Sequence, residues 1–136
     1  MAVATRLLTP RDVLDMMNRG ELVTDQGFEL VNGEIVWLAA SHSYESRVSM
    51  RIGVVLAPFA DAIGAALFDS SGGFTVGERL QQLRQPDVAL VVKERSHLID
   101  PDGWVAGAPD LAVEVLSQGE YGPTYARIKV PEYLSA

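Results

Sequence analysis

The sequence predicts one domain that combines α-helices with β-strands. An Asn32-Gly33 pair separates two strand-like runs, which is the strongest short-range signal for a β-hairpin. Apolar residues between positions 48 and 63 recur at three- and four-residue steps, as on one face of a helix. Residues 88–92 and 111–117 are apolar enough to be strands buried on both faces. The 136 residues suffice for one hydrophobic core and are too few for two domains, so we expect a single domain over residues 1–136.

The first half of the chain predicts a helix, a hairpin and a second helix. Thr9 and Pro10 begin the first helix and Gly20 ends it, since these residues are typical of an N-cap, a first helical position and a C-terminus. The hairpin pairs residues 28–31 with residues 34–38. The second helix follows Ser41-His42-Ser43, and we expect Pro58 to kink or shorten it.

The second half predicts mostly strands. Residues 65–68 and 74–76 flank a glycine-containing loop, which favours a second hairpin. Residues 78–85 are polar, and we expect an irregular segment there before the buried strand at 88–92. Residues 93–107 form a charged connector with a helical turn near 94–97, and residues 125–134 are helical around Pro131.

Composition restricts the classes of function and the compartment. The chain has no cysteine, which excludes disulfides and thiolate metal sites and fits the reducing cytoplasm. Its N-terminus lacks the basic and apolar regions of a signal peptide. The longest apolar run, residues 52–68, is interrupted by Pro58 and Asp61, so we expect no membrane span. The net charge of −7 argues against a nonspecific grip on phosphate backbones.

Glu114 lies inside an apolar run, where an unpaired carboxylate costs several kcal/mol. It must therefore be paired, protonated or bound to a cation. Asp87 stands at the mouth of the other buried strand. Two carboxylates on adjacent strands can hold Mg²⁺ for hydrolysis of a phosphodiester. Asp110 is a poorer partner, because four residues of extended strand place it roughly 13 Å from Glu114.

Several stretches, in the same order along the chain, resemble a bacterial family of restriction endonuclease-like proteins within the PD-(D/E)XK nuclease superfamily. They are residues 28–35, 68–74, 85–90, 107–117 and 129–134. The resemblance implies a restriction endonuclease-like α/β (α+β) core, with a central mixed β-sheet flanked by helices. It implies that Asp87 and Glu114 take the places of the family's two acidic residues. It also implies Mg²⁺ or Mn²⁺ as cofactor and DNA as substrate.

The lysine of the superfamily needs a separate assignment. The literal motif would place it at position 116, which is Leu116 here. The resemblance implies that it comes from the following helix, where Lys129 matches, and that it orients the attacking water and offsets charge on the phosphate. Residues 119–128 depart from the family's loop, and Pro131 leaves Lys129 near the first helical turn. The family also continues into a further strand beyond Ala136, so we expect a truncated chain or a sheet that lacks its closing element.

Glu45 is the fourth candidate, because superfamily members often supply an acid from the preceding helix. It shares a face with Val48 and Ile52 and should point inward to join Asp87 and Glu114 around the metal. Each candidate has a structural alternative. Glu45 can interact with the helix dipole, Asp87 can be a turn acid, Glu114 can form a buried salt bridge to Lys129, and Lys129 can be a solvated lysine.

The remaining polar and aromatic candidates have structural interpretations. We expect His42 and His97 at the surface, Trp37 and Trp104 in packing, and Glu29 and Glu34 as solubilising residues of the hairpin.

Two functional hypotheses follow. The first is a Mg²⁺-dependent endonuclease that uses Asp87, Glu114 and Lys129. The second is a catalytically inactive nuclease fold that acts as an interaction or assembly module, which the acidic charge, the altered loop before Lys129 and the missing C-terminal strand favour. Exposed edges of a small sheet also favour a homodimer.

Overall fold

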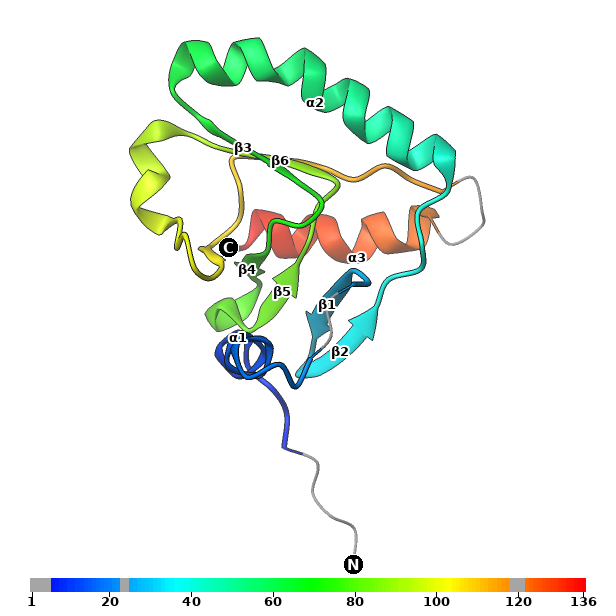
Figure 1. Cartoon of the computed structure of the whole chain (residues 1–136), viewed down its shortest axis with the longest axis vertical. Coiled ribbons are helices and arrows are strands. Elements are labelled where there is room, and N and C mark those ends of the chain that lie inside the picture. Colours follow the sequence, from blue (N-terminus) through cyan, green and yellow to red (C-terminus); the bar gives the residue numbers. More distant parts are fainter. Residues whose placement is uncertain (1–5, 23–24, 118–121) are drawn as a thin grey trace, which may run out of the picture.

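The strands form two sheets in the computed structural model, which describes residues 6–22, 25–117 and 122–136 (Figure 1). One sheet has five strands in the order β2-β1-β5-β4-β7, and the other has three in the order β3-β6-β8. The pair β4–β7 is parallel and the other pairs are antiparallel, so the larger sheet is mixed. The fold class is α+β with a mixed sheet and helices, as the sequence predicts.

The bounds of the elements are as follows. The strands are β1 (Phe28–Val31), β2 (Glu34–Trp37), β3 (Ala66–Asp69), β4 (Phe74–Val76), β5 (Gln82–Arg84), β6 (Val88–Val91), β7 (Val105–Ala106) and β8 (Leu111–Val113). The α-helices are α1 (Pro10–Asn18), α2 (Ser43–Ile63) and α3 (Gly122–Leu134), and the 3₁₀ helices are η1 (Glu78–Leu80) and η2 (Lys93–Leu98). None of the helices in the described ranges is both long and apolar enough to cross a membrane.

The predicted first helix and first hairpin are confirmed. The Thr9 side chain accepts a hydrogen bond from the Asp12 amide, and the Asp12 carboxylate accepts one from the Thr9 amide, which closes a reciprocal cap on α1. In the hairpin, Asn32 and Gly33 have φ values of 51° and 80°. A two-residue turn of the I′ type requires positive φ at both positions, which explains the Asn-Gly pair.

Helix α2 begins where the sequence predicts, but Pro58 does not shorten it. The helix continues past Pro58 and ends at Ile63, with Gly64 in the left-handed conformation. It contacts β3 and β6, so it covers one face of the three-stranded sheet (Figure 1). Of its 21 residues only Glu45 and Ala60 are buried.

Strands β3 and β4 exist as predicted, but they do not form a hairpin. Strand β3 pairs with β6, whereas β4 pairs with β5 and β7 in the other sheet. Strand β5 lies inside the stretch that was expected to be an irregular polar excursion. The prediction failed because these pairings join distant segments, and local sequence patterns carry no information on them.

Strands β6 and β8 carry the predicted acids and differ in burial. All four residues of β6 are buried, as predicted for the central strand of its sheet. Strand β8 is an edge strand with Leu111 exposed, so the expected burial on both faces is wrong. Glu114 therefore lies just beyond the end of a short strand and not in its middle.

Helix α3 runs between the three-stranded sheet and the β1–β2 hairpin (Figure 1). It includes the predicted tail helix and begins earlier, at Gly122. Tyr133 packs against one of two hydrophobic clusters, which centres on Phe74 and Val91. The other cluster centres on Leu30 and Leu83. The position of α3 allows its side chains to reach both sheets.

Candidate active site

Asp87 and Glu114 lie at the same end of the three-stranded sheet. Strands β6 and β8 are antiparallel, and their last registered pair is Val88 with Val113. Asp87 precedes that pair and Glu114 follows it, so continuation of the register would set the two residues opposite each other, with side chains toward one face. The Val115 amide donates a hydrogen bond of 2.6 Å to Asp87 Oδ2, which holds the two segments together.

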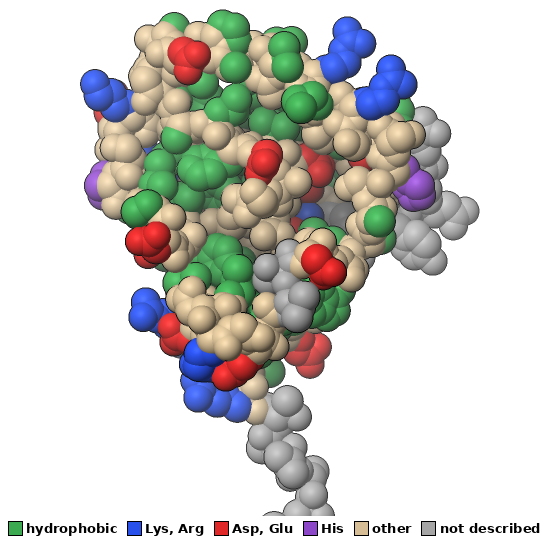
Figure 2. Space-filling model, viewed as in Figure 1, with side chains coloured by type: hydrophobic (Ala, Val, Ile, Leu, Met, Phe, Trp, Pro, Cys, Tyr) green, Lys and Arg blue, Asp and Glu red, His purple; other side chains and the backbone are tan. Residues whose placement is uncertain are grey.

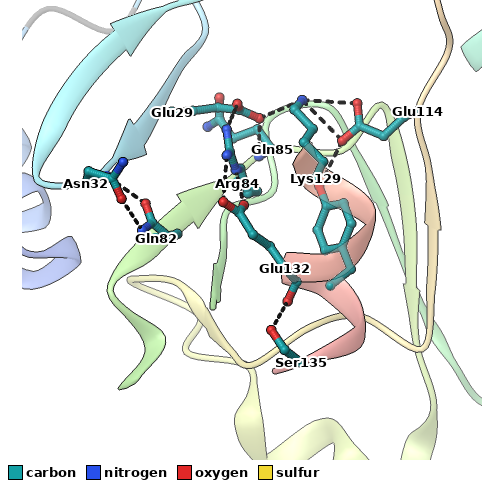
Figure 3. A network of polar contacts seen from close by, with 10 residues as sticks. Glu29, Asn32, Gln82, Arg84, Gln85, Glu114, Lys129, Glu132 and Ser135 are labelled. Atoms are coloured by element: carbon teal, nitrogen blue, oxygen red, sulfur yellow. Dashed lines mark hydrogen bonds and ion pairs between the residues drawn. The ribbon is translucent and has the colours of Figure 1, made fainter. Parts of the chain in front are cut away.

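Lys129 extends from α3 to the carboxylate of Glu114 (Figure 3). Its Nζ donates to Glu114 Oε2 at 3.2 Å and to Oε1 at 3.3 Å. Tyr133, one helical turn further along α3, donates its hydroxyl to Glu114 Oε1 at 2.8 Å. Lys129 is only 7% exposed, so it is not a solvated lysine. The alternative of a salt bridge between Glu114 and Lys129 is present in the structure.

Glu29 is a third acid of this cluster, and its interpretation as a solubilising hairpin residue is wrong. It is 1% exposed, and its Oε1 lies 3.0 Å from Lys129 Nζ. The same oxygen accepts the Gln85 amide at 3.2 Å, and Oε2 accepts Arg84 Nη1 at 2.7 Å. The criterion that singled out Glu114, a carboxylate inside an apolar strand, also applies to Glu29 and could have identified it from the sequence.

Arg84 connects Glu29 to helix α3. Its Nε and Nη2 donate to the two oxygens of Glu132 at 2.6 Å and 3.0 Å, a bidentate pair (Figure 3). Arg84 is 3% exposed. The buried polar network therefore comprises two cations and three carboxylates, and it joins β1, β5, α3 and the segment after β8.

Glu45 points inward from the first turn of α2, as predicted. The residue is 9% exposed, and its Oε2 is buried without a hydrogen-bond partner among the described residues. The nearest basic atom recorded for it is Nδ1 of His42, at 3.6 Å, on a largely exposed side chain. A buried carboxylate oxygen with this little compensation is costly, so the position favours a cation near Glu45.

Burial raises the pKa values of the two acids Asp87 and Glu114, whereas neighbouring charges determine the direction for Lys129. Burial raises the pKa of Asp87, and the carboxylates of Glu29 and Glu45 raise it further, against the opposing effects of the Val115 amide and Lys129. Burial also raises the pKa of Glu114, although Lys129 and Tyr133 partly offset it. For Lys129, burial works against the charged amine, but Glu29 and Glu114 outweigh it and raise its pKa.

The carboxylates do not form a three-ligand cluster. Among the residues that the structure describes, no three His, Cys, Asp or Glu side chains lie close enough to hold one metal ion. Glu114 is engaged by Lys129 and Tyr133, whereas Glu45 Oε2 accepts no hydrogen bond from the part of the chain that the structure describes. Asp87 and Glu45 are thus the acids best able to accept a cation, and Mg²⁺ often binds proteins through one or two carboxylates while it retains several waters.

A groove of about 780 Å³ opens beside Asp87, between α2 and β3. Its walls combine apolar side chains such as Met50 and Phe68 with serine hydroxyls such as those of Ser46 and Ser49. No lysine or arginine of residues 6–22, 25–117 and 122–136 lines it. Solvent can reach Asp87 through this groove.

The other candidates have structural roles. Asp110 accepts hydrogen bonds from Arg95 and from the Val92 amide. It therefore stabilises the start of η2 and is not part of the site around Asp87 and Glu114. Trp104 packs against Phe28 and donates to the Pro10 carbonyl, as expected for a packing residue. His97 and Glu34 are exposed, as predicted.

Comparison with known proteins bears on the fold and on the family. A solved structure, a "putative nuclease belonging to DUF820" from Anabaena variabilis, superposes with a TM-score of 0.65 at 19% identity and covers 90% of this chain. The chain spans 66% of the length of that protein. No curated protein matches the chain. The family named Uma2 and described as "Putative restriction endonuclease" matches residues 15–136, and the chain belongs to that family.

Proposed function

We propose that the chain is a divalent-metal-dependent endonuclease that hydrolyses phosphodiester bonds in DNA. The observation that carries this proposal is the position of Asp87 and Glu114 at the same end of β6 and β8, with Lys129 3.2 Å from Glu114, in a chain of the Uma2 family. Two partly buried carboxylates and a buried amine next to an open groove suit hydrolysis of a phosphate ester.

Each acid has a distinct role in the proposed reaction. Asp87 and Glu45 would hold a hydrated Mg²⁺ or Mn²⁺, and Glu114 would lie beside that site and hold Lys129 in place. The unpartnered Oε2 of Glu45 and the raised pKa of Asp87 support this fit, because a cation would offset the cost of both buried charges. A bound cation would polarise the phosphate and lower the pKa of the attacking water. Lys129 orients that water and offsets negative charge on the phosphate.

A second candidate function is a nuclease fold without activity that acts as an interaction or assembly module. Lys129 and Tyr133 already satisfy both oxygens of Glu114, as in a structural salt bridge. The net charge of −7 also opposes association with DNA. In this case the buried network serves only to fix α3 against the two sheets.

Cleavage of DNA and binding of Mn²⁺ test the two functions together. We expect the wild-type protein to cut DNA with Mg²⁺ or Mn²⁺ and not with chelator, and Asp87→Asn and Glu114→Gln to reduce cutting by at least about 100-fold. The exposed acids Asp61 and Glu34 provide the matched controls Asp61→Asn and Glu34→Gln. Calorimetry should detect heat of Mn²⁺ binding that is reduced in Asp87→Asn and in Glu114→Gln.

The outcomes separate the hypotheses. Identical DNA patterns from wild type and Asp87→Asn would refute the endonuclease. An absence of both cutting and Mn²⁺ heat would favour the interaction module. For its partners and compartment, we expect DNA as substrate, a homodimer as the assembled state and the cytoplasm as location.

A further inference from the structure

We propose that Glu29 is a positioning residue that fixes Lys129 and the Asp87 segment relative to each other. The inference rests on the proposed function and extends it to a residue of β1, which lies in the other sheet from β6 and β8. A single buried carboxylate contacts the amine of Lys129 and the backbone two residues before Asp87. Glu29 does not itself contact the reacting atoms in this role.

The two oxygens of Glu29 have separate tasks. Oε1 accepts the Gln85 amide at 3.2 Å and lies 3.0 Å from Lys129 Nζ, so it links the strand start to α3. Oε2 accepts Arg84 Nη1 at 2.7 Å, which fixes the rotation of the carboxylate. The Phe28 amide donates to the Gln85 side chain at 3.3 Å, a second bond between the same two segments. Strand β1 therefore holds Arg84 and Gln85, directly before Pro86 and Asp87, through two successive residues.

The charge of Arg84 does not by itself explain why a second carboxylate, that of Glu29, is buried beside it. Glu132 already binds Arg84 through two hydrogen bonds, and it is partly accessible to water, so that pair is complete without a second acid. A buried carboxylate in addition to that pair is costly unless another cation uses it. Lys129 is that cation, and it lies between Glu29 on one side and Glu114 on the other (Figure 3).

Contact from two sides determines where the amine points. With Glu29 present, Lys129 is shared between two carboxylates and remains at the edge of Glu114. Without the charge on Glu29, the amine has Glu114 as its remaining carboxylate and is free to rotate around it. We therefore expect Glu29→Gln to mobilise Lys129 while Arg84 retains its bidentate partner.

The small number of lysines allows the mobility of the Lys129 amine to be measured by nuclear magnetic resonance. The sequence contains two lysines, Lys93 and Lys129, and Lys93 is exposed. In protein labelled with ¹⁵N-lysine, a buried ammonium in slow exchange gives a sharp ¹H–¹⁵N signal, whereas an exposed one exchanges quickly with water. We expect one persistent ammonium signal in wild type, assigned to Lys129 by its loss in Lys129→Arg.

The matched control is Glu132→Gln. Both Glu29→Gln and Glu132→Gln remove one carboxylate from Arg84, but Glu29 alone of the two also contacts Lys129. The expected result is loss or broadening of the Lys129 signal in Glu29→Gln and its retention in Glu132→Gln. A Lys129 signal that persists unchanged in Glu29→Gln, or disappears equally in both variants, would overturn the proposal.

Kinetics supply the second measurement. We expect Glu29→Gln to lower kcat for DNA cleavage by about 10- to 100-fold with little change in KM, as for residues that orient a reacting group. Glu132→Gln should stay within about threefold of wild type, and equal losses in the two variants would contradict a positioning role. If Glu29→Gln does not fold, Glu29→Asp is the second variant. It keeps the charge but shortens the side chain, and the expected results are again a weakened Lys129 signal and a lower kcat. Wild type that cuts no DNA would refute the proposed function, and the lysine spectrum would still decide the role of Glu29.

Discussion

Asp87 is held in a position that disfavours its ionised form. Burial, with the nearby carboxylates of Glu29 and Glu45, raises its pKa above the value of 3.8 in the unfolded chain. A carboxyl group with a raised pKa binds its proton more tightly in the folded state, so its contribution to stability falls as the pH rises through that range. At pH 7 the charge on Asp87 therefore opposes folding, which is typical of a residue retained for function.

The variant Asp87→Asn should be more stable than wild type at pH 7. An asparagine oxygen can still accept the Val115 amide, while the buried charge is removed. We expect calorimetry to give a melting temperature higher by a few degrees at pH 7, and the difference should vanish below about pH 3, where the wild-type carboxyl is neutral in both states. The exposed control Asp61→Asn should change neither value. A clear decrease in the melting temperature of Asp87→Asn would contradict this account.

Tyr133 makes the fold sensitive to alkali. Burial and the Glu114 carboxylate raise the pKa of Tyr133 far above its ordinary value of 10. The unfolded chain loses the phenolic proton near pH 10 and the folded chain does not, so stability falls above that pH by about 1.4 kcal/mol per pH unit for this group. The raised pKa of Lys129 acts in the same direction above pH 10.5.

The variant Tyr133→Phe should therefore lose stability less steeply between pH 10 and 11.5. Urea unfolding at a series of pH values measures the slope, and the expected reduction is about 1.4 kcal/mol per pH unit relative to wild type. Tyr44 is exposed on α2, so Tyr44→Phe is the matched control and should retain the wild-type slope. Equal slopes for Tyr133→Phe and wild type would indicate that the phenol ionises inside the fold.

At the scale of elements, the cap of α1 is a local device that can be tested by itself. The Thr9 hydroxyl accepts the Asp12 amide at 3.2 Å and donates to the Asp12 carboxylate at 2.8 Å. We expect Thr9→Ala to lower the free energy of unfolding by about 1 kcal/mol, because it leaves an amide of the first turn without a partner. Thr9→Ser retains the hydroxyl and should stay within about 0.5 kcal/mol of wild type in the same urea titration. A loss equal to that of Thr9→Ala would show that the methyl group and not the hydroxyl stabilises this end of α1.

Elements defined by local signals could be predicted from the sequence, and those defined by distant pairing could not. The Asn32-Gly33 turn, the cap at Thr9 and the strand at 88–91 each follow from neighbouring residues. Strand β5 was missed because its pattern is polar: its outer residue Gln82 binds Asn32, and its inner Arg84 is neutralised by acids from β1 and α3. Sequence alone does not distinguish such a buried ion pair from solvated surface charge.

The same contrast applies to the candidate site. Asp87 and Glu114 could be proposed from their positions in apolar runs, and Glu45 from its helical face. Glu29 satisfied the same criterion but lay in a hairpin, where an acid that serves solubility is an adequate explanation, and this favoured a surface interpretation. The face of β1 that carries Glu29 is buried only because Arg84 and Lys129 approach it, and neither contact is encoded near residue 29.

At the scale of the whole molecule, the buried network holds the two sheets together. Glu29 and Arg84 belong to the five-stranded sheet, Glu114 follows the last strand of the other, and α3 binds all three residues. The proposed active site and the junction between the sheets are therefore the same structure. Substitutions of Glu29, Glu114 or Lys129 should therefore change stability and activity together, whereas Glu132→Gln leaves Arg84 paired with Glu29 and should change stability more than activity.

The surface of α2 predicts self-association. Figure 2 shows hydrophobic side chains along this helix, and those recorded as exposed are Tyr44, Met50, Val54, Val55, Phe59 and Ile63. Large apolar residues gathered on one solvent-facing helix are typical of an interface, because their burial in a dimer stabilises the pair by about 25 cal/mol per Å² of apolar surface. A twofold contact through Val55, Phe59 and Ile63 would cover these three residues in both copies and leave the groove beside Asp87 open.

Sedimentation velocity at tens of micromolar tests this homodimer. We expect wild type to sediment with twice the chain mass of 14.7 kDa. Phe59 is 55% exposed between Val55 and Ile63, so Phe59→Lys should give the monomer by placing a charge in the interface without disturbing the core. His97 is exposed on η2, away from this helix in the sequence, and His97→Lys should remain dimeric. Wild type that sediments as a monomer, or a Phe59→Lys variant that remains a dimer, would exclude α2 as the interface.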